Sequence, residues 1–366
     1  MKTRHMYAYI AAGTLGILLA AAAVFAAEGG PVVAPGFTIH KCARADSISL
    51  ADYLDGPVLL FFYDGGIAPD TDALRYATEW DRRYAGDGLS IIGMHTPFFE
   101  PSKVPRNAIE IVGTIGVSFP VGLDMDGRIF DLYREAAFAP AKPAAPPAFV
   151  LIEPGGEVQA AVAGRQSYAA VEESIQALLR ELNPDVILPL VMKPLRPWDD
   201  PTAEIFRPTD MVILGYAGGQ IADFDSTRRD DLAEYTDTFE RTRETVFLSG
   251  RWRVDEYSIS HSDSAGRPGD YLRIIYRGKT VWVLPCFDYG TRPVVYLRQD
   301  RSDLSPESWG KHVMSDGIGR PYIYMNYCMP LQIVNNPAYG THQLELIAGE
   351  GDVSFYYLFF EGDARK

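Results

Sequence analysis

The most informative hydrophobic pattern lies between residues 58 and 88. Val58–Phe62 is a continuous apolar run, which is typical of a central strand covered on both faces. Asp64-Gly65-Gly66 then predicts a tight loop, and Pro69 precedes apolar residues at helical spacing. Gly86-Asp87-Gly88 ends this helix. We therefore expect a buried strand, a tight loop and a helix start, an arrangement in which many α/β proteins place their chemistry.

Strand and helix patterns continue to alternate up to residue 183. The strands are expected at Leu89–Met94, Phe119–Leu123, Ala148–Ile152 and Glu157–Ala163. Two further helices are marked by Ile109, Val112 and Ile115, and by Val171, Ile175, Leu178 and Leu182. Strands that alternate with helices predict an α/β domain with a mixed sheet and helices on both faces, over residues 37–183.

The pattern changes after a proline-rich segment. Residues 184–208 carry six prolines and predict a semi-extended linker, whose apolar residues Val186–Met192 are expected to pack on one of the domains.

Residues 209–362 then show short aromatic and β-branched segments without helices between them. The expected strands are Thr245–Leu248, Trp252–Val254, Tyr257–Ser260, Tyr271–Tyr276, Thr280–Leu284, Pro293–Leu297, Tyr322–Met325, His342–Ile347 and Val353–Phe360. This pattern predicts an all-β antiparallel sandwich or jelly roll.

The N-terminus predicts a targeting segment. Lys2 and Arg4 precede the apolar run Tyr9–Phe25, and Val24-Phe25-Ala26 places small residues where a signal peptidase cleaves. We expect residues 1–27 to be a signal peptide, with a single membrane anchor as the alternative. Either way the remaining chain is expected outside the cytoplasm: periplasmic, secreted or anchored by one N-terminal helix. Disulfides persist in such compartments.

Charge and cysteine content narrow the function further. The formal net charge of −14 argues against nucleic acid as a partner, and against a membrane except through an uncleaved N-terminal segment. The three cysteines, Cys42, Cys286 and Cys328, form no C-x-x-C pair and have no zinc-ligand spacing. Cys286 and Cys328 could form a disulfide or remain two buried thiols. No metal and no cofactor are expected.

Four stretches resemble the thioredoxin-like redoxins of the TlpA and DipZ type, in the AhpC/TSA-redoxin superfamily. They are Gly56–Phe62, Leu89–Pro97, Phe119–Asp124 and Pro147–Gly156, and the ending His95-Thr96-Pro97 is the most specific. Three later stretches look like the galactose-binding-like β-sandwich that follows the redoxin in DipZ proteins. They are Leu214–Tyr216, Leu248–Trp252 and His342–Leu346. The resemblance implies both folds over most of the chain after Phe37.

One departure from the family matters more than these matches. The family's C-x-x-C pair falls on Ile67 and Asp70, with Ala68 and Pro69 between them. Dithiol exchange needs a thiolate at a helix N-terminus, and neither residue supplies one. The resemblance also places Pro147 at the family's cis-proline, which holds an extended substrate backbone. We therefore expect a vestigial redox site at Ile67, Asp70 and Pro147. Its groove could still bind polypeptide, or Pro147 could serve the fold alone, and the Pro146–Pro147 isomer is open.

Other candidate sites are weaker. Asp124, Asp126 and Gly127 mimic the start of a calcium loop, but the remaining oxygen ligands are absent and a turn is the better interpretation. Many rings lie on the predicted strands of the second domain, and we expect one or two at most on a binding face. These rings are Trp252, Tyr271, Trp282, Tyr296, Trp309, Tyr322 and Tyr324.

The sequence thus predicts a non-catalytic extracytoplasmic thioredoxin-fold protein. It would act as a binding or scaffold module for an envelope protein or a glycan, with no catalytic residue of its own. The alternative is a thiol–disulfide oxidoreductase or redox-accessory protein that uses cysteines outside the usual site, either Cys42 or a Cys286–Cys328 pair.

Overall fold

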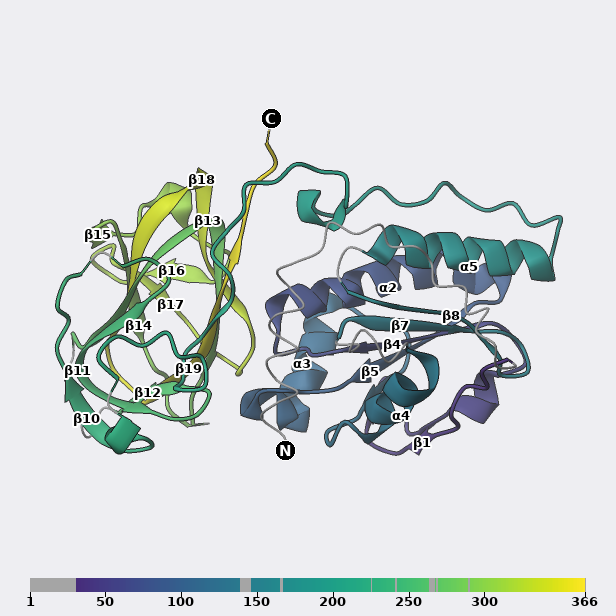
Figure 1. Cartoon of the computed structure of the whole chain (residues 1–366), viewed down its shortest axis with the longest axis horizontal. Helices are drawn as coiled ribbons and strands as arrows, with labels where there is room; N and C mark the ends of the chain where they lie inside the picture. Colours follow the sequence, from purple (N-terminus) through teal and green to yellow (C-terminus); the bar gives the residue numbers. More distant parts are fainter. Residues whose placement is uncertain are drawn as a thin grey trace. The chain divides into compact units, whose positions relative to one another are not determined.

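The computed structural model describes residues 31–138, 146–164, 167–224, 226–240, 242–262, 267, 269–288 and 290–365. The chain divides into two compact units between Thr202 and Ala203 (Figure 1). The predicted leader over residues 1–27 lies outside the described residues. Across the described ranges, no helix is both long and apolar enough to cross a membrane.

The first unit, unit 1, is built on a six-stranded mixed sheet with strand order β2-β6-β5-β4-β7-β8. Its strands are β2 (Cys42–Ala43), β4 (Val58–Tyr63), β5 (Ser90–His95), β6 (Val121–Leu123), β7 (Ala148–Ile152) and β8 (Val158–Ala163). Strands β4, β5 and β6 are parallel, whereas β2, β7 and β8 run antiparallel to their neighbours. A separate two-stranded sheet pairs β1 (Thr38–Ile39) with β3 (Ile48–Ser49).

Helices cover both faces of the six-stranded sheet (Figure 1). The α-helices are α2 (Thr71–Tyr84), α3 (Pro105–Ile115), α4 (Arg128–Ala137) and α5 (Tyr168–Leu182). Short 3-10 helices are η1 (Leu50–Tyr53), η2 (Ala68–Asp70), η3 (Ala85–Asp87), η4 (Glu100–Lys103) and η6 (Pro197–Asp199). This is the predicted thioredoxin-like α/β fold.

Strand β4 is buried along its whole length because both of its faces are packed. Phe62 on one face lies with its ring centroid 5.1 Å from that of Phe130 on α4. Phe61 on the other face stacks at 5.9 Å on Phe149 of β7, which in turn meets Trp80 of α2 at 5.8 Å. The continuous apolar run Val58–Phe62 therefore reflects two-sided burial, as the sequence predicted.

The proline-rich segment after α5 is tied to unit 1 by polar contacts. We call residues 189–199 the strap. The Arg83 guanidinium and the Gln176 amide donate hydrogen bonds to the carbonyl oxygens of Leu190 (2.9 Å) and Pro189 (2.8 Å). The prediction that the apolar residues of Val186–Met192 pack on one of the domains holds only in part. Ile187 and Leu190 are 94% and 89% exposed, whereas Val186, Leu188, Val191 and Met192 are partly buried. Hydrogen bonds from side chains of α2 and α5 to backbone carbonyls thus hold the strap.

The second unit, unit 2, is an all-antiparallel β structure, in agreement with the predicted sandwich. Its eleven strands are β9 (Val212–Ile213), β10 (Leu232–Tyr235), β11 (Val246–Val254), β12 (Ile259–His261), β13 (Tyr271–Cys286), β14 (Val295–Gln299), β15 (Ser302–Asp303), β16 (Val313–Ser315), β17 (Pro321–Ile323), β18 (Leu331–Ala348) and β19 (Val353–Glu361). Two 3-10 turns, η7 (Ser226–Arg228) and η8 (Pro306–Ser308), interrupt the connections.

Two pairs of predicted strands are single bent strands. Thr245–Leu248 and Trp252–Val254 are both parts of β11, and Tyr271–Tyr276 and Thr280–Leu284 are both parts of β13. Gly250 has a φ of +94° in the middle of β11, and the register of β13 shifts between Gly278 and Thr280. Glycine marks a bulge here and not a turn, so the strand bends and continues.

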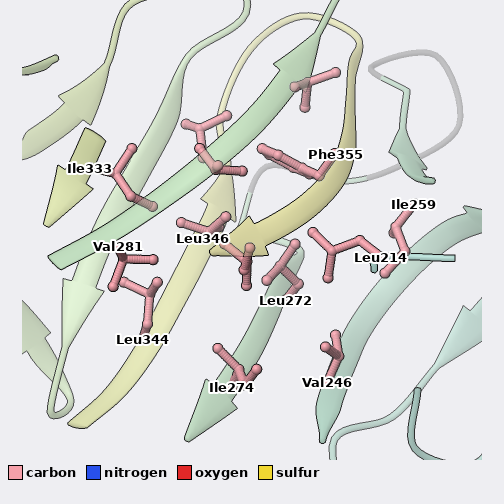
Figure 2. Packing of buried hydrophobic residues seen from close by; sticks show 14 of the residues in the cluster. Leu214, Val246, Ile259, Leu272, Ile274, Val281, Ile333, Leu344, Leu346 and Phe355 are labelled. Atoms are coloured by element: carbon pink, nitrogen blue, oxygen red, sulfur yellow. The ribbon is translucent and has the colours of Figure 1, made fainter. Parts of the chain in front are cut away.

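The bend in β13 lets one strand serve two partners. Its first half pairs with β11, and its second half pairs with β19, while β18 follows it throughout. Strands β11, β12, β19 and β13 thereby form a closed ring of pairings. Figure 2 shows the apolar side chains enclosed by these strands, among them Val246, Leu272 and Phe355, each 0% exposed.

Candidate functional site

The candidate site lies at the end of β4, where the redoxin family keeps its thiols. The loop Asp64–Ile67 joins β4 to η2, and α2 follows directly. His95 ends the neighbouring strand β5 opposite Tyr63. Strand β7 begins at Ala148 opposite Phe62, so Pro147 reaches the same edge of the sheet. The fold therefore brings together the loop, His95 and Pro147, although they are far apart in the sequence.

Three consecutive backbone N–H groups of this loop donate to side chains of the same site. The Asp64 N–H donates to Asp70 Oδ2 at 3.4 Å, the Gly65 N–H to His95 Nδ1 at 3.1 Å, and the Gly66 N–H to Asp64 Oδ1 at 2.7 Å. The Phe98 N–H adds a 2.7 Å bond to Asp64 Oδ2. The loop thus satisfies its own donors with local carboxylate and imidazole acceptors.

Close packing leaves no room for a side chain at Gly66. A Cβ atom built there would lie 1.6 Å from Ser102 Oγ, far inside van der Waals contact. Gly66 is therefore required by the approach of η4 to the loop.

Burial sets the protonation states in the site. Burial raises the pKa of Asp64 to about 6, although the N–H groups of Phe98 and Gly66 oppose this rise. Burial lowers the pKa of His95 to about 4. His95 is thus neutral at pH 7. Its Nδ1 atom accepts the hydrogen bond of the Gly65 N–H, so the ring proton is on Nε2. Nε2 donates this proton to the Ser102 carbonyl at 2.9 Å. The imidazole acts as a structural bridge between two loops.

Ile67 and Asp70 are the residues to which the sequence resemblance assigns the positions of the family's two thiols. Ile67 is partly exposed and directly precedes η2, and its carbonyl accepts the N–H of Asp70 at 2.9 Å. Asp70 is 1% exposed. The Pro146–Pro147 peptide bond is cis. None of the side chains of Ile67, Asp70 and Pro147 is a nucleophile toward sulfur.

Cys42 cannot substitute for the missing thiols. It lies on β2 at the edge of the sheet, three strand positions from β4 in the order β2-β6-β5-β4. At about 4.8 Å per strand this is roughly 14 Å, whereas a disulfide brings two Cα atoms within about 7 Å. Its thiol donates to the Ile39 carbonyl at 3.4 Å, and burial raises its pKa.

The other two cysteines are joined in unit 2. A disulfide links Cys286 at the end of β13 to Cys328, with an S–S distance of 2.06 Å. Cys42 is the free cysteine of the chain. Sulfur is therefore absent from the loop where this fold supports redox chemistry.

The other sequence candidates have structural roles. The Asp124 carboxylate accepts the N–H groups of Ile129 (3.1 Å) and Phe130 (2.9 Å), and so caps the start of α4. The interpretation of this segment as a turn is confirmed by the Gly127 N–H bond to the Asp124 carbonyl. Within the described ranges, no group of three or more potential metal ligands comes together.

Strand register separates the rings of unit 2 into core and surface. Trp252 and Trp282 are buried, at 0% and 7% exposure. Tyr296 and Tyr322 are direct cross-strand partners on β14 and β17 and are partly exposed. The Arg320 guanidinium lies 4.2 Å from the Tyr296 ring centroid and covers it.

Sequence reasoning missed the part played by Asp64 and Ser102. The position of Asp64 directly after a buried strand was the available signal of a functional carboxylate. Its role was still not predicted, because the two N–H groups that it accepts lie 2 and 34 residues away in the sequence. Nothing local in the sequence marks Ser102, because its contact with Gly66 depends on the packing of η4.

Comparison with known proteins agrees with the resemblance found in the sequence. No protein family profile matches the chain. DipZ proteins of Mycobacterium bovis and Mycobacterium tuberculosis are each 26% identical over 215 residues, which is 58% of this chain and 28% of theirs. The chain thus spans little more than a quarter of the length of these relatives. The resemblance of the chain to a DipZ-type thioredoxin-like redoxin is confirmed.

Two solved structures match part of the chain. A putative thiol:disulfide interchange protein DsbE from Chlorobium tepidum matches with a TM-score of 0.35 and 18% identity, over 42% of this chain and 99% of that one. Peroxidoxin BcpB from Mycobacterium tuberculosis matches with a TM-score of 0.34 and 18% identity, over 42% of this chain and 97% of that one.

Proposed function

We propose that this chain is a non-catalytic extracytoplasmic binding protein in which unit 1 serves as a scaffold. Its partner would be an envelope protein or a glycan. The observation that carries the proposal is a loop after β4 that holds no cysteine and whose N–H groups are bonded to Asp64, Asp70 and His95. The resemblance assigns the family's thiol positions to Ile67 and Asp70 of this segment. Disulfide exchange requires a sulfur nucleophile at this loop.

The location outside the cytoplasm rests on two independent features. The first 27 residues have the composition of a signal peptide or an anchor. The Cys286–Cys328 disulfide fits an oxidising compartment, since the cytosol keeps most thiols reduced.

Thiol–disulfide exchange through Cys42 is the alternative function. Cys42 is a free and partly exposed thiol, which is the feature that favours it. Burial raises its pKa, which keeps the thiolate fraction small at neutral pH. The other two cysteines of the chain are joined to each other in unit 2.

An insulin-reduction assay with dithiothreitol as the electron donor separates the two functions. We expect the full-length protein to leave the rate at its uncatalysed value, and thiol titration of the denatured, unreduced protein to find one thiol per chain. Catalysed turnover that disappears in Cys42→Ser would overturn the proposal in favour of the alternative.

A further inference from the structure

The strap, residues 189–199, lies against five polar side chains of unit 1 that we call the strap-binding face. They are Asp72, Tyr76 and Arg83 on α2, and Glu172 and Gln176 on α5. The strap is bonded to Arg83 in the last turn of α2 at its start and to Asp72 in the first turn near its end. It therefore runs antiparallel to α2 along the whole length of this helix.

The first part of the strap is held through its carbonyl oxygens. The Gln176 amide donates to the Pro189 carbonyl at 2.8 Å, and the Arg83 guanidinium donates to the Leu190 carbonyl at 2.9 Å. A proline offers a carbonyl as any other residue does, and its fixed φ favours an extended chain. These two contacts thus accept proline without loss.

The middle of the strap is held through its N–H groups. The Met192 N–H donates to Glu172 Oε2 at 2.9 Å, and the Leu195 N–H donates to the Tyr76 hydroxyl at 2.7 Å. Every residue except proline carries this donor. Together with the two carbonyl contacts, these bonds select an extended backbone and are compatible with many different side chains.

Two further contacts add a preference for charge. The Arg196 guanidinium pairs with Asp72 at 2.7 Å, and the Tyr76 hydroxyl donates to Asp199 Oδ2 at 2.9 Å. Asp72 and Asp199 are each 3% exposed. Charged partners with so little access to water bind each other more strongly than exposed ones. The preferred chain therefore carries a cation and, three residues later, a carboxylate.

The strap-binding face is fixed by contacts within unit 1. Glu172 Oε1 accepts the Tyr84 hydroxyl at 2.6 Å and also pairs with Arg83, which leaves Oε2 for the strap. The ring of Tyr76 stacks on that of Tyr168 with a centroid distance of 3.9 Å. The acceptors are therefore held in place by bonds other than those to the strap, which is the preorganisation that a binding site needs.

Apolar burial contributes less to the hold on the strap. Leu190 is 89% exposed and Leu195 is 48% exposed, whereas Val191 and Met192 are partly buried. A segment that is attached chiefly by polar contacts at the surface opens more readily than one that is packed into a core. The strap is thus suited to leave the strap-binding face while unit 1 stays folded.

We propose that the strap-binding face takes an extended, proline-rich segment of a partner polypeptide, and that the strap occupies this face until the partner displaces it. The inference rests on the proposed binding function and gives it a site and a class of partner. The strap is itself such a chain, with prolines at positions 189, 194 and 197. A partner segment that offers the same backbone atoms would make the same bonds.

Fluorescence anisotropy with a labelled peptide of residues 189–199, the strap peptide, tests the proposal. The acceptor is the full-length variant Met192→Pro/Leu195→Pro, whose own strap loses both N–H donors while the strap-binding face is unchanged. We expect this variant to bind the strap peptide with a Kd of about 0.1 mM. The wild type should bind it about tenfold more weakly or less, because its own strap competes. A peptide with Leu190→Ser/Leu195→Ser should bind the acceptor within about threefold of the strap peptide, because the face bonds the backbone.

Matched variants show whether the peptide occupies the strap-binding face. Tyr76→Phe, added to the acceptor, should weaken binding about tenfold, whereas Tyr133→Phe should not change it. A peptide that itself carries Met192→Pro/Leu195→Pro should bind about tenfold more weakly than the strap peptide. The full-length variant Arg196→Ala releases the strap by a different change and should also bind the strap peptide, which guards against misfolding of the proline variant.

Three results would overturn the proposal. The first is no binding of the strap peptide by either released variant, and the second is binding that is equal in the wild type or unchanged by Tyr76→Phe. The third is binding of the strap peptide without binding of the serine peptide, which would restrict the face to the chain's own strap. None of these results bears on the insulin assay, so failure of this site is distinguishable from failure of the proposed function.

Discussion

At the end of β4, one buried carboxylate and one buried imidazole make the hydrogen bonds that organise the loop. Asp64 binds two N–H groups and His95 bridges two loops. Both side chains are buried, at 1% and 0% exposure, so water does not compete for these bonds. The site is organised by hydrogen-bond acceptors, which explains how the loop can keep its shape without a disulfide.

The pKa shifts of these two residues have opposite effects on stability. Asp64 has a folded pKa of about 6, above its ordinary 3.8, so protonation stabilises unit 1 as the pH falls through 6 towards 3.8. His95 has a folded pKa of about 4, below its ordinary 6.5, so stability is lost as the pH falls from 6.5 towards 4. Each shift exceeds two units, or about 3 kcal/mol.

We therefore expect His95→Asn to expose the contribution of Asp64. Between pH 7 and pH 5, His95 should cost the wild type about 2 kcal/mol of unfolding free energy, and the variant lacks this loss. The change in unfolding free energy should therefore be about 2 kcal/mol more favourable in the variant than in the wild type. Hydrogen exchange of β4 amides at both pH values measures this difference. His342→Asn in unit 2 is the control and should leave the pH dependence of β4 unchanged. Parallel pH profiles for His95→Asn and the wild type would contradict the shifts.

At the scale of elements, polar contacts attach the strap to helix α2. The Tyr76 hydroxyl on α2 donates to Asp199 Oδ2 at 2.9 Å and accepts the Leu195 N–H at 2.7 Å. The Arg196 guanidinium pairs with Asp72 at 2.7 Å. One buried hydroxyl thus joins two points of the strap, so its loss should release the segment as a whole.

Tyr76→Phe should speed the exchange of the Leu195 amide, and the cleavage of the strap by proteases, about five- to 150-fold, because 1–3 kcal/mol of hydrogen bonding is lost. Tyr133→Phe is the matched control: its hydroxyl donates to the Pro35 carbonyl at 2.8 Å, away from the strap. It should leave exchange in the strap at the wild-type rate. Equal protection of Leu195 in Tyr76→Phe and the wild type would show that the strap does not depend on this hydroxyl.

How far the sequence predicts these elements depends on how local their causes are. Strand β4 is predicted because its two-sided burial is written in five consecutive apolar residues, Val58–Phe62. Strand β13 is divided in two because Gly278 signals a turn locally, whereas its bulge depends on pairing with β18 some 60 residues away. In the site, the spacing of the family's motif singles out Ile67 and Asp70. The contact between Ser102 and Gly66 could not be predicted, because it depends on the packing of η4 against the loop.

At the scale of the whole molecule, unit 2 carries a covalent link that unit 1 lacks. Cys286 and Cys328 are separated by 42 residues. Closing a loop of that length removes chain entropy worth about 4 kcal/mol from the unfolded state. The disulfide is therefore a large part of the stability expected of a domain.

Cys286→Ser/Cys328→Ser should lower the unfolding free energy of unit 2 by about 4 kcal/mol and leave that of unit 1 unchanged. Guanidinium unfolding followed by hydrogen exchange in β13 and β4 separates the two units. Cys42→Ser is the control and should not alter β13. A double variant whose β13 amides are as protected as in the wild type would contradict a stabilising role of the disulfide.

The central claim is that unit 1 keeps the frame of a thiol–disulfide site without its sulfur. The most direct measurement compares insulin reduction by the wild type with that by Ile67→Cys/Asp70→Cys, which returns a C-x-x-C pair to the start of α2. We predict that the wild type does not exceed the uncatalysed rate, whereas the double variant does. Catalysis by the wild type that Cys42→Ser abolishes would contradict the account.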